Sequence, residues 1–188
     1  MSYGISALGR KRGGIGDDGI LFSPSLAIHT GDSALKIVSF DIEANGLLYT
    51  ATKTHCICMY DNQEKEYSFS NEEYKKALVL LDTYDLIVGH NICGYDLPLL
   101  EKLYGWTPKS KVLDTHILSR LNEPDRPQGH SIEAYAKQFG MEKVGADIED
   151  WATLTDYMLD RCKNDAKVGW KTFEYLNKRM GLGYELLG

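Results

Sequence analysis

The stretch "VSFDIEANGLL", residues 38–48, places Asp41 and Glu43 one residue apart at the end of an apolar, β-branched run. Such a run predicts a β-strand, and alternate side chains of a strand lie on the same face of the sheet. The two acids therefore share a face at the carboxyl end of the strand, where open α/β sheets usually bind ligands. Carboxylates this close repel each other, which raises the hypothesis of a cation between them, but for such a pair alone a solvated strand end is the more common explanation. The apolar face of the strand is expected to enter the core: Val38, Phe40 and Ile42.

The segments around this strand predict an α/β fold. Apolar and β-branched runs indicate the strands of an antiparallel meander at residues 36–42, 46–52, 55–61 and 65–70. Asn71 is expected to cap a helix that ends near Leu81, and the apolar run 85–90 indicates a strand buried on both faces. The remainder is mainly helical, with a strand end opening the second segment and one or two helices in the last: 95–105, 112–121, 130–140 and 150–180. This order predicts a mixed sheet, an antiparallel meander plus parallel strands, flanked by helices.

The composition is that of a soluble globular protein. The chain has 188 residues, of which 43% are hydrophobic and 26% charged, and this is sufficient for one domain with a core. The net charge of −6 argues against a protein that coats nucleic acid non-specifically, but not against a nuclease whose carboxylates bind metal. No apolar run could span a membrane and no signal-peptide core is present, so a cytoplasmic location is expected.

Residues 1–35 differ from the rest of the chain. They are rich in glycine and carry a basic triplet, Arg10, Lys11 and Arg12, beside acidic residues. We expect a flexible N-terminal extension here and one domain over residues 36–188. A solvated tail is the first interpretation of the triplet, and contact with a phosphate backbone is the second.

Several other residues have adequate structural explanations. Cys56 and Cys58 alternate in an apolar run without the CxxC spacing of a zinc site, which predicts reduced core thiols. Asp114 is expected to cap a helix, and His116 and His130 need no functional role. The tryptophans and most tyrosines are expected in packing rather than in stacking on nucleic-acid bases.

Two further acids occupy notable positions. Asp96 begins the helix after the buried strand, where the helix dipole favours an acid by about 0.3–1 kcal/mol, and this is a sufficient structural explanation. Asp165 lies on the inward stripe of the last helix, as judged by its spacing from Leu154, Met158 and Cys162. An ionised acid facing a core is costly unless it is paired or bound to metal. An ion pair between Asp165 and a nearby Lys or Arg is the alternative.

Taken together, the acids predict a metal site built from Asp41, Glu43, Asp96 and Asp165. Carboxylate oxygens are hard ligands that suit Mg²⁺ or Mn²⁺. Four carboxylates around two such ions, about 4 Å apart, can clamp the attacking and leaving oxygens of a phosphodiester. The pattern therefore points to phosphodiester hydrolysis.

Three ordered motifs carry a resemblance to a known family. "FDIEANG" at 40–46, "HNICGYDLPLL" at 90–100 and "CKNDAKV" at 162–168 resemble the exonuclease motifs of the DEDD 3′–5′ exonuclease superfamily, which has an RNase H-like fold. The similarity is strongest to the proofreading exonuclease domain of short-tailed-phage family A DNA polymerases. "LDTHILSRL" and "GHSIEAYAKQFG" also look like segments of that domain, and the resemblance extends from Lys36 to Met180.

This resemblance implies a metal-dependent 3′–5′ exonuclease that acts on single-stranded DNA 3′ ends and releases nucleoside 5′-monophosphates. It implies that the four acids hold two divalent ions, Mg²⁺ or Mn²⁺. Residues near the 3′-terminal nucleotide would be Asn45, Gly46, His90, Asn91 and Tyr95. The chain stops at Gly188 with no polymerase part, which suggests a free-standing enzyme or the proofreading subunit of a separate DNA polymerase, in a phage protein acting in the host cytoplasm. An RNA exonuclease and a catalytically weakened binding or polymerase-accessory protein are the alternatives.

One position departs from the family pattern. The family usually places a tyrosine four residues before the last acid, or a histidine five before it, to orient the attacking water, whereas this chain has Arg161 and Asp160 there. Arg161 lies one helical turn from Asp165 and can reach the same site. It could contact the scissile phosphate, pair with an acid of the site, or mark reduced activity. We include Arg161 among the catalytic candidates.

Overall fold

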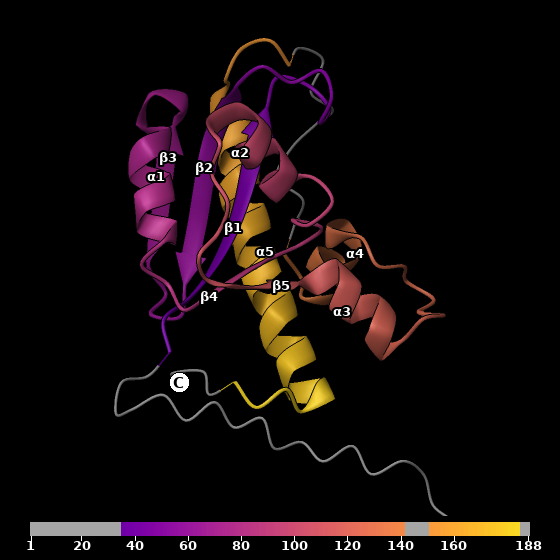
Figure 1. Ribbon diagram of the computed structural model, residues 1–188. Helices are drawn as coiled ribbons and strands as arrows, with labels where there is room; N and C mark the ends of the chain where they lie inside the picture. The colour runs from indigo at the N-terminus through magenta and orange to yellow at the C-terminus, as the bar shows by residue number, and fades with distance from the viewer. Residues whose placement is uncertain (1–34, 142–150, 185–188) are drawn as a thin grey trace, which may run out of the picture.

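The computed structural model describes residues 35–141 and 151–184. Its described strands form one mixed five-stranded sheet in the order β3-β2-β1-β4-β5 (Figure 1). Strands β3, β2 and β1 run antiparallel, and β1, β4 and β5 run parallel, which confirms the predicted combination of a meander with parallel strands. The strand bounds are Ile37–Ala44 (β1), Thr54–Asp61 (β2), Glu66–Ser70 (β3), Leu86–Gly89 (β4) and Lys111–Asp114 (β5).

Helices cover both faces of the sheet. Helices α1 and α2 pack on one face, α5 crosses the other, and α3 and α4 lie beside α5 (Figure 1). A short 3₁₀ turn, η1, leads into α1. The helix bounds are Asn71–Glu73 (η1), Tyr74–Leu81 (α1), Asp96–Tyr104 (α2), Thr115–Asn122 (α3), Ile132–Gln138 (α4) and Asp156–Met180 (α5).

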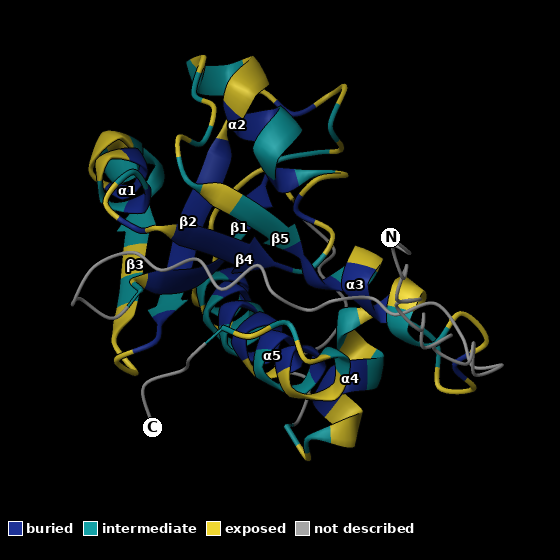
Figure 2. Ribbon diagram, turned by 60° about the horizontal axis from the view of Figure 1, so that its bottom comes forward, coloured by how far each residue is buried: buried dark blue, intermediate teal, exposed yellow. Residues whose placement is uncertain are grey.

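Strand β1 is the centre of the core, as its burial along most of its length shows (Figure 2). Its apolar side chains pack with α1 and α2, as predicted: Val38, Phe40 and Ile42. The opposite face of the sheet packs against α5 through Ile37 and Val88, which contact Trp170 and Phe173. The alternation of β1 thus turns its acids toward α5.

Helix α5 is one continuous helix, and its path brings it close to β1. The Thr155 side chain accepts a hydrogen bond from the Met158 N–H and caps the start, and Gly181 in the left-handed conformation ends the helix. Within the helix, Gly169 faces Ser39 so closely that a Cβ atom there would lie 2.8 Å from the serine oxygen. The glycine therefore permits the close approach of α5 to β1.

Three local expectations were wrong. Residues 46–52 form a turn rather than a strand, because the N–H groups of Thr50 and Ala51 donate to the carbonyl of Leu47 instead of to a neighbouring strand. Asn71 does not cap a helix, since its side chain accepts from the Tyr104 hydroxyl at 3.0 Å. Leu154 precedes α5 and is 40% exposed, so the buried stripe of the helix begins only later.

The remaining structural expectations concern the cysteines and the termini. All four cysteines are free thiols, and Cys56, Cys58 and Cys162 are buried, as predicted for the first two, while Cys93 is exposed. The N-terminal extension lies outside the described residues except for Leu35. Among the residues that the structure describes, no helix combines the length and apolar character needed to cross a membrane.

Candidate active site

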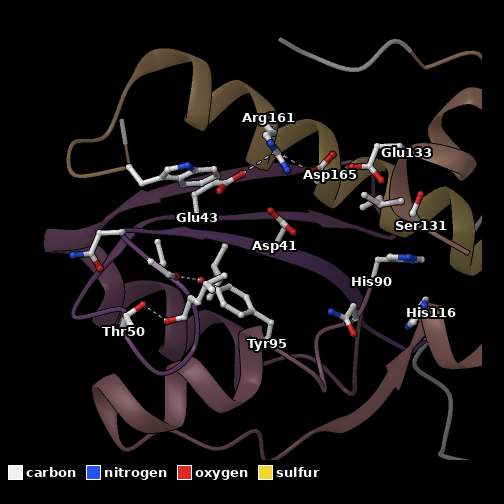
Figure 3. Close-up of a pocket in the computed structure, with 18 residues that line it drawn as sticks. Asp41, Glu43, Thr50, His90, Tyr95, His116, Ser131, Glu133, Arg161 and Asp165 are labelled. Carbon is white, nitrogen blue, oxygen red and sulfur yellow. Dashed lines mark hydrogen bonds and ion pairs between the residues drawn. The ribbon is translucent and has the colours of Figure 1, made fainter. Parts of the chain in front are cut away.

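Three acids from β1 and α5 meet at the carboxyl end of β1. One carboxylate oxygen from each of Asp41, Glu43 and Asp165 lies within 4.8 Å of the other two. The two strand acids share a face because they are two residues apart, and α5 carries Asp165 over that face (Figure 3). This spacing is short enough for all three to bind one cation or a pair of cations.

Asp96 lies at the start of α2 and is hydrogen bonded to β1, but it is not one of the three acids in this group. Its carboxylate Oδ1 accepts a hydrogen bond from the Ile42 N–H at 3.1 Å, and only 5% of the residue is exposed. Strand β4 pairs with β1 only as far as Ser39. Beyond that point, the carboxylate of Asp96 accepts the hydrogen bond of a β1 backbone N–H group. The negative charge of Asp96 helps to raise the pKa of Asp41, and the charge of Glu43 helps to raise that of Asp96.

The electrostatics of the cluster favour the binding of a cation. Burial raises the pKa of Asp41 well above its usual range, and the neighbouring charges of Asp96 and Asp165 raise it further. Burial also raises the pKa of Glu43 to about 7, against the opposing effect of Arg161. Burial raises the pKa of Asp96 to about 8, although backbone hydrogen bonds oppose this. A divalent cation would offset both the cost of burying these charges and the repulsion between them.

Arg161 supplies positive charge at the cluster. Its Nε atom lies 3.3 Å from Glu43 Oε1 and 3.6 Å from Asp165 Oδ2. The guanidinium spans the strand acid and the helix acid (Figure 3), and its side chain is 28% exposed on the pocket side. The ion pair that was the alternative explanation for Asp165 is therefore present, with Arg161 as the partner, and the acidic cluster is present as well.

A cavity of about 770 Å³ opens over these acids. Its walls come from β1, the loop after it, the loop after β4 and the first turn of α4, and from α5. Five positions expected near a substrate line it, as do several that the sequence did not single out as functional, three of which carry imidazole, carboxylate or indole groups. The expected ones are Asn45, Gly46, His90, Asn91 and Tyr95, and these three are His116, Glu133 and Trp151.

The loop after β1 is held in a defined shape by its own side chains. The side-chain Oδ1 atom of Asn45 accepts from the N–H groups of Thr52 and Lys53, so this side-chain amide stabilises the loop instead of projecting into the cavity. The Tyr95 hydroxyl donates to the Gly46 carbonyl at 2.6 Å and joins the loop to α2. The ammonium of Lys102 donates to three loop carbonyls, those of Leu48, Tyr49 and Ala51.

The loop after β4 is organised by Asp114. This buried carboxylate caps α3, as predicted, and also accepts from the Asn91 and Cys93 N–H groups at 2.9 and 3.0 Å. Asn91 adopts a positive φ of 62° in this loop. His90 Nδ1 is hydrogen bonded to the Thr115 hydroxyl at 2.9 Å, and burial lowers the pKa of His90 to about 4, so the ring is neutral. Asp114 therefore has a second role that its sequence position does not reveal.

Trp151 lines the pocket and is hydrogen bonded to a residue at a bulge in β2. The register of β1 and β2 shifts between Glu43 and Ala44, which leaves His55 as an extra residue in β2. His55 is buried, and its Nε2 atom is 2.8 Å from the Trp151 carbonyl oxygen. The indole lines the cavity and remains 39% exposed. No sequence pattern signals this placement, because it involves a contact with a residue far away in the chain.

The fold and the acidic site define a nuclease-like α/β protein. A sequence profile of the RNase_H superfamily matches residues 38–165, which include all five strands and end at the acid of α5. The chain therefore belongs to the RNase H superfamily, and this confirms the predicted RNase H-like fold.

Two curated relatives are the DNA-directed DNA polymerases of Escherichia phage T7 and Enterobacteria phage T3. Each is 34% identical over 144 residues, and the match covers 68% of this chain and 20% of the polymerase. The chain thus spans about a fifth of the length of these relatives. The matched part supports the resemblance to phage polymerase exonuclease domains.

Solved structures with the same fold include nucleases and a polymerase. Brucella melitensis NrnC bound to pGG aligns with a TM-score of 0.59 at 18% identity, covering 77% of this chain and 73% of that chain. Brucella melitensis NrnC with bound Mg²⁺ gives 0.57 at 20% identity, covering 78% and 76%. The family B DNA polymerase of the archaeon Pyrobaculum calidifontis gives 0.58 at 15% identity, covering 77% and 25%.

Proposed function

We propose that this protein is a metal-dependent 3′–5′ exonuclease that removes nucleoside 5′-monophosphates from single-stranded DNA ends. One observation carries the proposal: carboxylate oxygens of Asp41, Glu43 and Asp165 gather within 4.8 Å at the floor of a cavity, beside the buried carboxylate of Asp96. The relatives support the same class, because their matched region belongs to replicative DNA polymerases.

The donor set fits divalent metal ions. It consists of carboxylate oxygens, which suit Mg²⁺ and Mn²⁺. Burial raises the pKa of Glu43 and of Asp96, so a bound cation would favour their ionised forms. The residues that would hold two ions are Asp41, Glu43, Asp96 and Asp165. When bound, such ions supply an activated water and stabilise charge on the leaving 3′ oxygen.

The protein's own groups would hold and polarise the substrate. Arg161 is within reach of the same oxygens as the ions, so its guanidinium can contact a phosphate that approaches Glu43 and Asp165. The braced loop of Asn45 and Gly46 forms one wall for a terminal nucleotide, and the indole of Trp151 forms another. Neutral His90, with Asn91 and Tyr95, completes the lining around the sugar and base.

A second function is favoured by the salt bridges of Arg161. This side chain bridges two of the acids and occupies the position where the family has a water-orienting tyrosine. A catalytically weakened protein that binds nucleic acid, or that serves a separate DNA polymerase as an accessory subunit, would keep the same pocket. RNA is the alternative substrate within the enzyme class.

The deciding experiment uses oligonucleotides labelled at the 5′ end. With Mg²⁺ or Mn²⁺ and the full chain, we expect a ladder shortened from the 3′ end on single-stranded DNA, and a slower one on RNA of the same sequence. Asp165→Asn should abolish the ladder, whereas Asp156→Asn, at an exposed acid in the first turn of the same helix, should leave it unchanged. An intact DNA band at every metal concentration, with oligonucleotide still bound, would establish the binding function instead.

A further inference from the structure

A second group of metal-ligating side chains lies beside the acids, between β2 and α5. Cys56 and Cys58 project from β2 and Cys162 from α5, and their sulfur atoms all lie within 4.8 Å of one another. Each residue is completely buried, and each is a free thiol. Three thiols this close, drawn from two elements, form a more specific arrangement than the scattered core cysteines that packing alone produces.

The spacing of the sulfur atoms suits coordination of one ion. A zinc–sulfur bond is about 2.3 Å long, so two sulfurs on a single ion lie roughly 4 Å apart. The three thiols need only a small contraction to reach that separation. Thiolates select soft closed-shell cations over Mg²⁺ and Mn²⁺. We propose that Cys56, Cys58 and Cys162 form a binding site for such a cation, Zn²⁺ or Cu⁺.

The surroundings offer further ligands and separate the two sites. The Ser68 hydroxyl lies 3.7 Å from Cys58 Sγ, which places one oxygen beside the thiols as a fourth group for Zn²⁺, whereas Cu⁺ is satisfied by the three sulfurs. In the register of the sheet, Cys58 is paired with Asp41 and Cys56 with Glu43, so sulfur and oxygen ligands lie side by side on one face. Soft cations would therefore bind to the thiols, and hard cations to the neighbouring carboxylates.

Occupation of the thiol site would act on the strand that carries the acids. Cys162 Sγ lies 3.3 Å from the Asp41 carbonyl oxygen and donates to it. A thiolate bound to metal has no proton to donate, so the hydrogen bond from Cys162 to Asp41 would be lost. In its place, the ion would link the sulfur of Cys162 to the two cysteines of β2. The ion would cross-link β2 to α5 beside the acids, and it would stabilise the folded state by mass action.

The test is a metal titration of the full, reduced chain carrying Cys93→Ser, which removes the exposed thiol. Zn²⁺ is titrated against a chromophoric chelator, and Cu⁺ is titrated in the same way without oxygen. We expect one equivalent of one ion per chain, unchanged by Asp165→Asn, and about 100-fold weaker binding after Cys58→Val or Cys162→Ala. The ion that binds more tightly is the one the site selects.

Two measurements keep the result decisive. Circular dichroism establishes that each variant is folded, and thermal unfolding should show a metal-dependent rise in Tm in Cys93→Ser that is absent from both thiol variants. Ultraviolet absorption from sulfur-to-metal charge transfer with Cd²⁺ as the probe should follow the same pattern. If neither ion is retained by Cys93→Ser, or if binding persists after both thiol substitutions, the three cysteines are ordinary core residues and the proposal is wrong.

Discussion

The Nε atom of Arg161 lies 3.3 Å from Glu43 Oε1, so a cationic side chain of α5 forms an ion pair with an acid of β1 in the lining of the cavity. The same guanidinium reaches Asp165 one turn further along α5. An arginine in this position neutralises part of the acidic cluster in the absence of metal, and it carries a positive charge toward any phosphate that enters. Both effects can be measured separately.

Arg161→Gln should separate these two effects. We expect kcat for DNA cleavage at saturating Mg²⁺ to fall roughly 10- to 100-fold, because charge stabilisation of the phosphate is lost. The Mg²⁺ concentration for half-maximal activity should fall about 2- to 5-fold, because the competing ion pair is partly exposed and weak. Arg179→Gln, an exposed arginine near the end of the same helix, is the control. A rise in kcat would instead mean that Arg161 attenuates the enzyme, and Arg161→Tyr should then raise it further.

The stability of the metal-free protein should depend on pH in an unusual direction. Burial raises the pKa of Glu43 to about 7 and that of Asp96 to about 8, from usual values of 4.5 and 3.8. The folded state therefore binds protons more tightly than the unfolded chain, so these acids stabilise the fold fully near pH 4 and progressively less as pH rises through about 8. Denaturant unfolding with a chelator should show this loss, on the order of a few kcal/mol.

Two comparisons isolate the contribution of the acidic cluster to that pH dependence. Saturating Mg²⁺ should flatten the profile, because the ions favour the ionised carboxylates. Glu43→Gln should flatten it partly without metal, since the variant lacks one of the titrating groups. An unfolding free energy that is the same in Glu43→Gln and the parent protein at every pH would contradict the shift assigned to Glu43.

Asp165→Asn tests whether the acids serve catalysis or stability. The substitution preserves side-chain shape while it removes one charge from a cluster in which like charges raise the pKa of Asp41. We expect cleavage to fall at least about 100-fold, the scale on which metal sites respond to lost supporting groups. The free energy of unfolding without metal should stay unchanged or rise, because repulsion decreases. Parental activity in a folded variant would contradict the assignment of Asp165 to the metal site.

Trp151→Ala tests the aromatic wall of the cavity. The indole lines the pocket and remains partly exposed, so it is available to stack on a terminal base. Stacking is worth about 1–3 kcal/mol per base, so KM for single-stranded DNA should rise about 5- to 50-fold with a smaller change in kcat. Leu154→Ala is the matched control, since Leu154 is similarly exposed but lies in a different pocket. Equal KM values in both variants would exclude a stacking role for Trp151.

The sequence determined the local features that periodicity and capping control. The alternation in β1 separates the core residues from Asp41 and Glu43, because strand side chains alternate regardless of tertiary context. The Asp114 cap also followed from local chemistry. The turn at 46–52 did not follow in this way, because its apolar residues favour a strand. The neighbouring Asn45 and the distant Lys102 hold it as a loop through side-chain hydrogen bonds.

Only the tertiary structure decided which of these residues meet. Helix α5 brings Arg161 and Asp165 over β1 through the close approach at Gly169, and His55 at the bulge in β2 is hydrogen bonded to Trp151 of the cavity wall. The convergence of Cys162 with the two cysteines of β2 has the same origin. Such contacts depend on the register and packing of elements far apart in the chain, whereas a sequence pattern reports only on neighbours within one element.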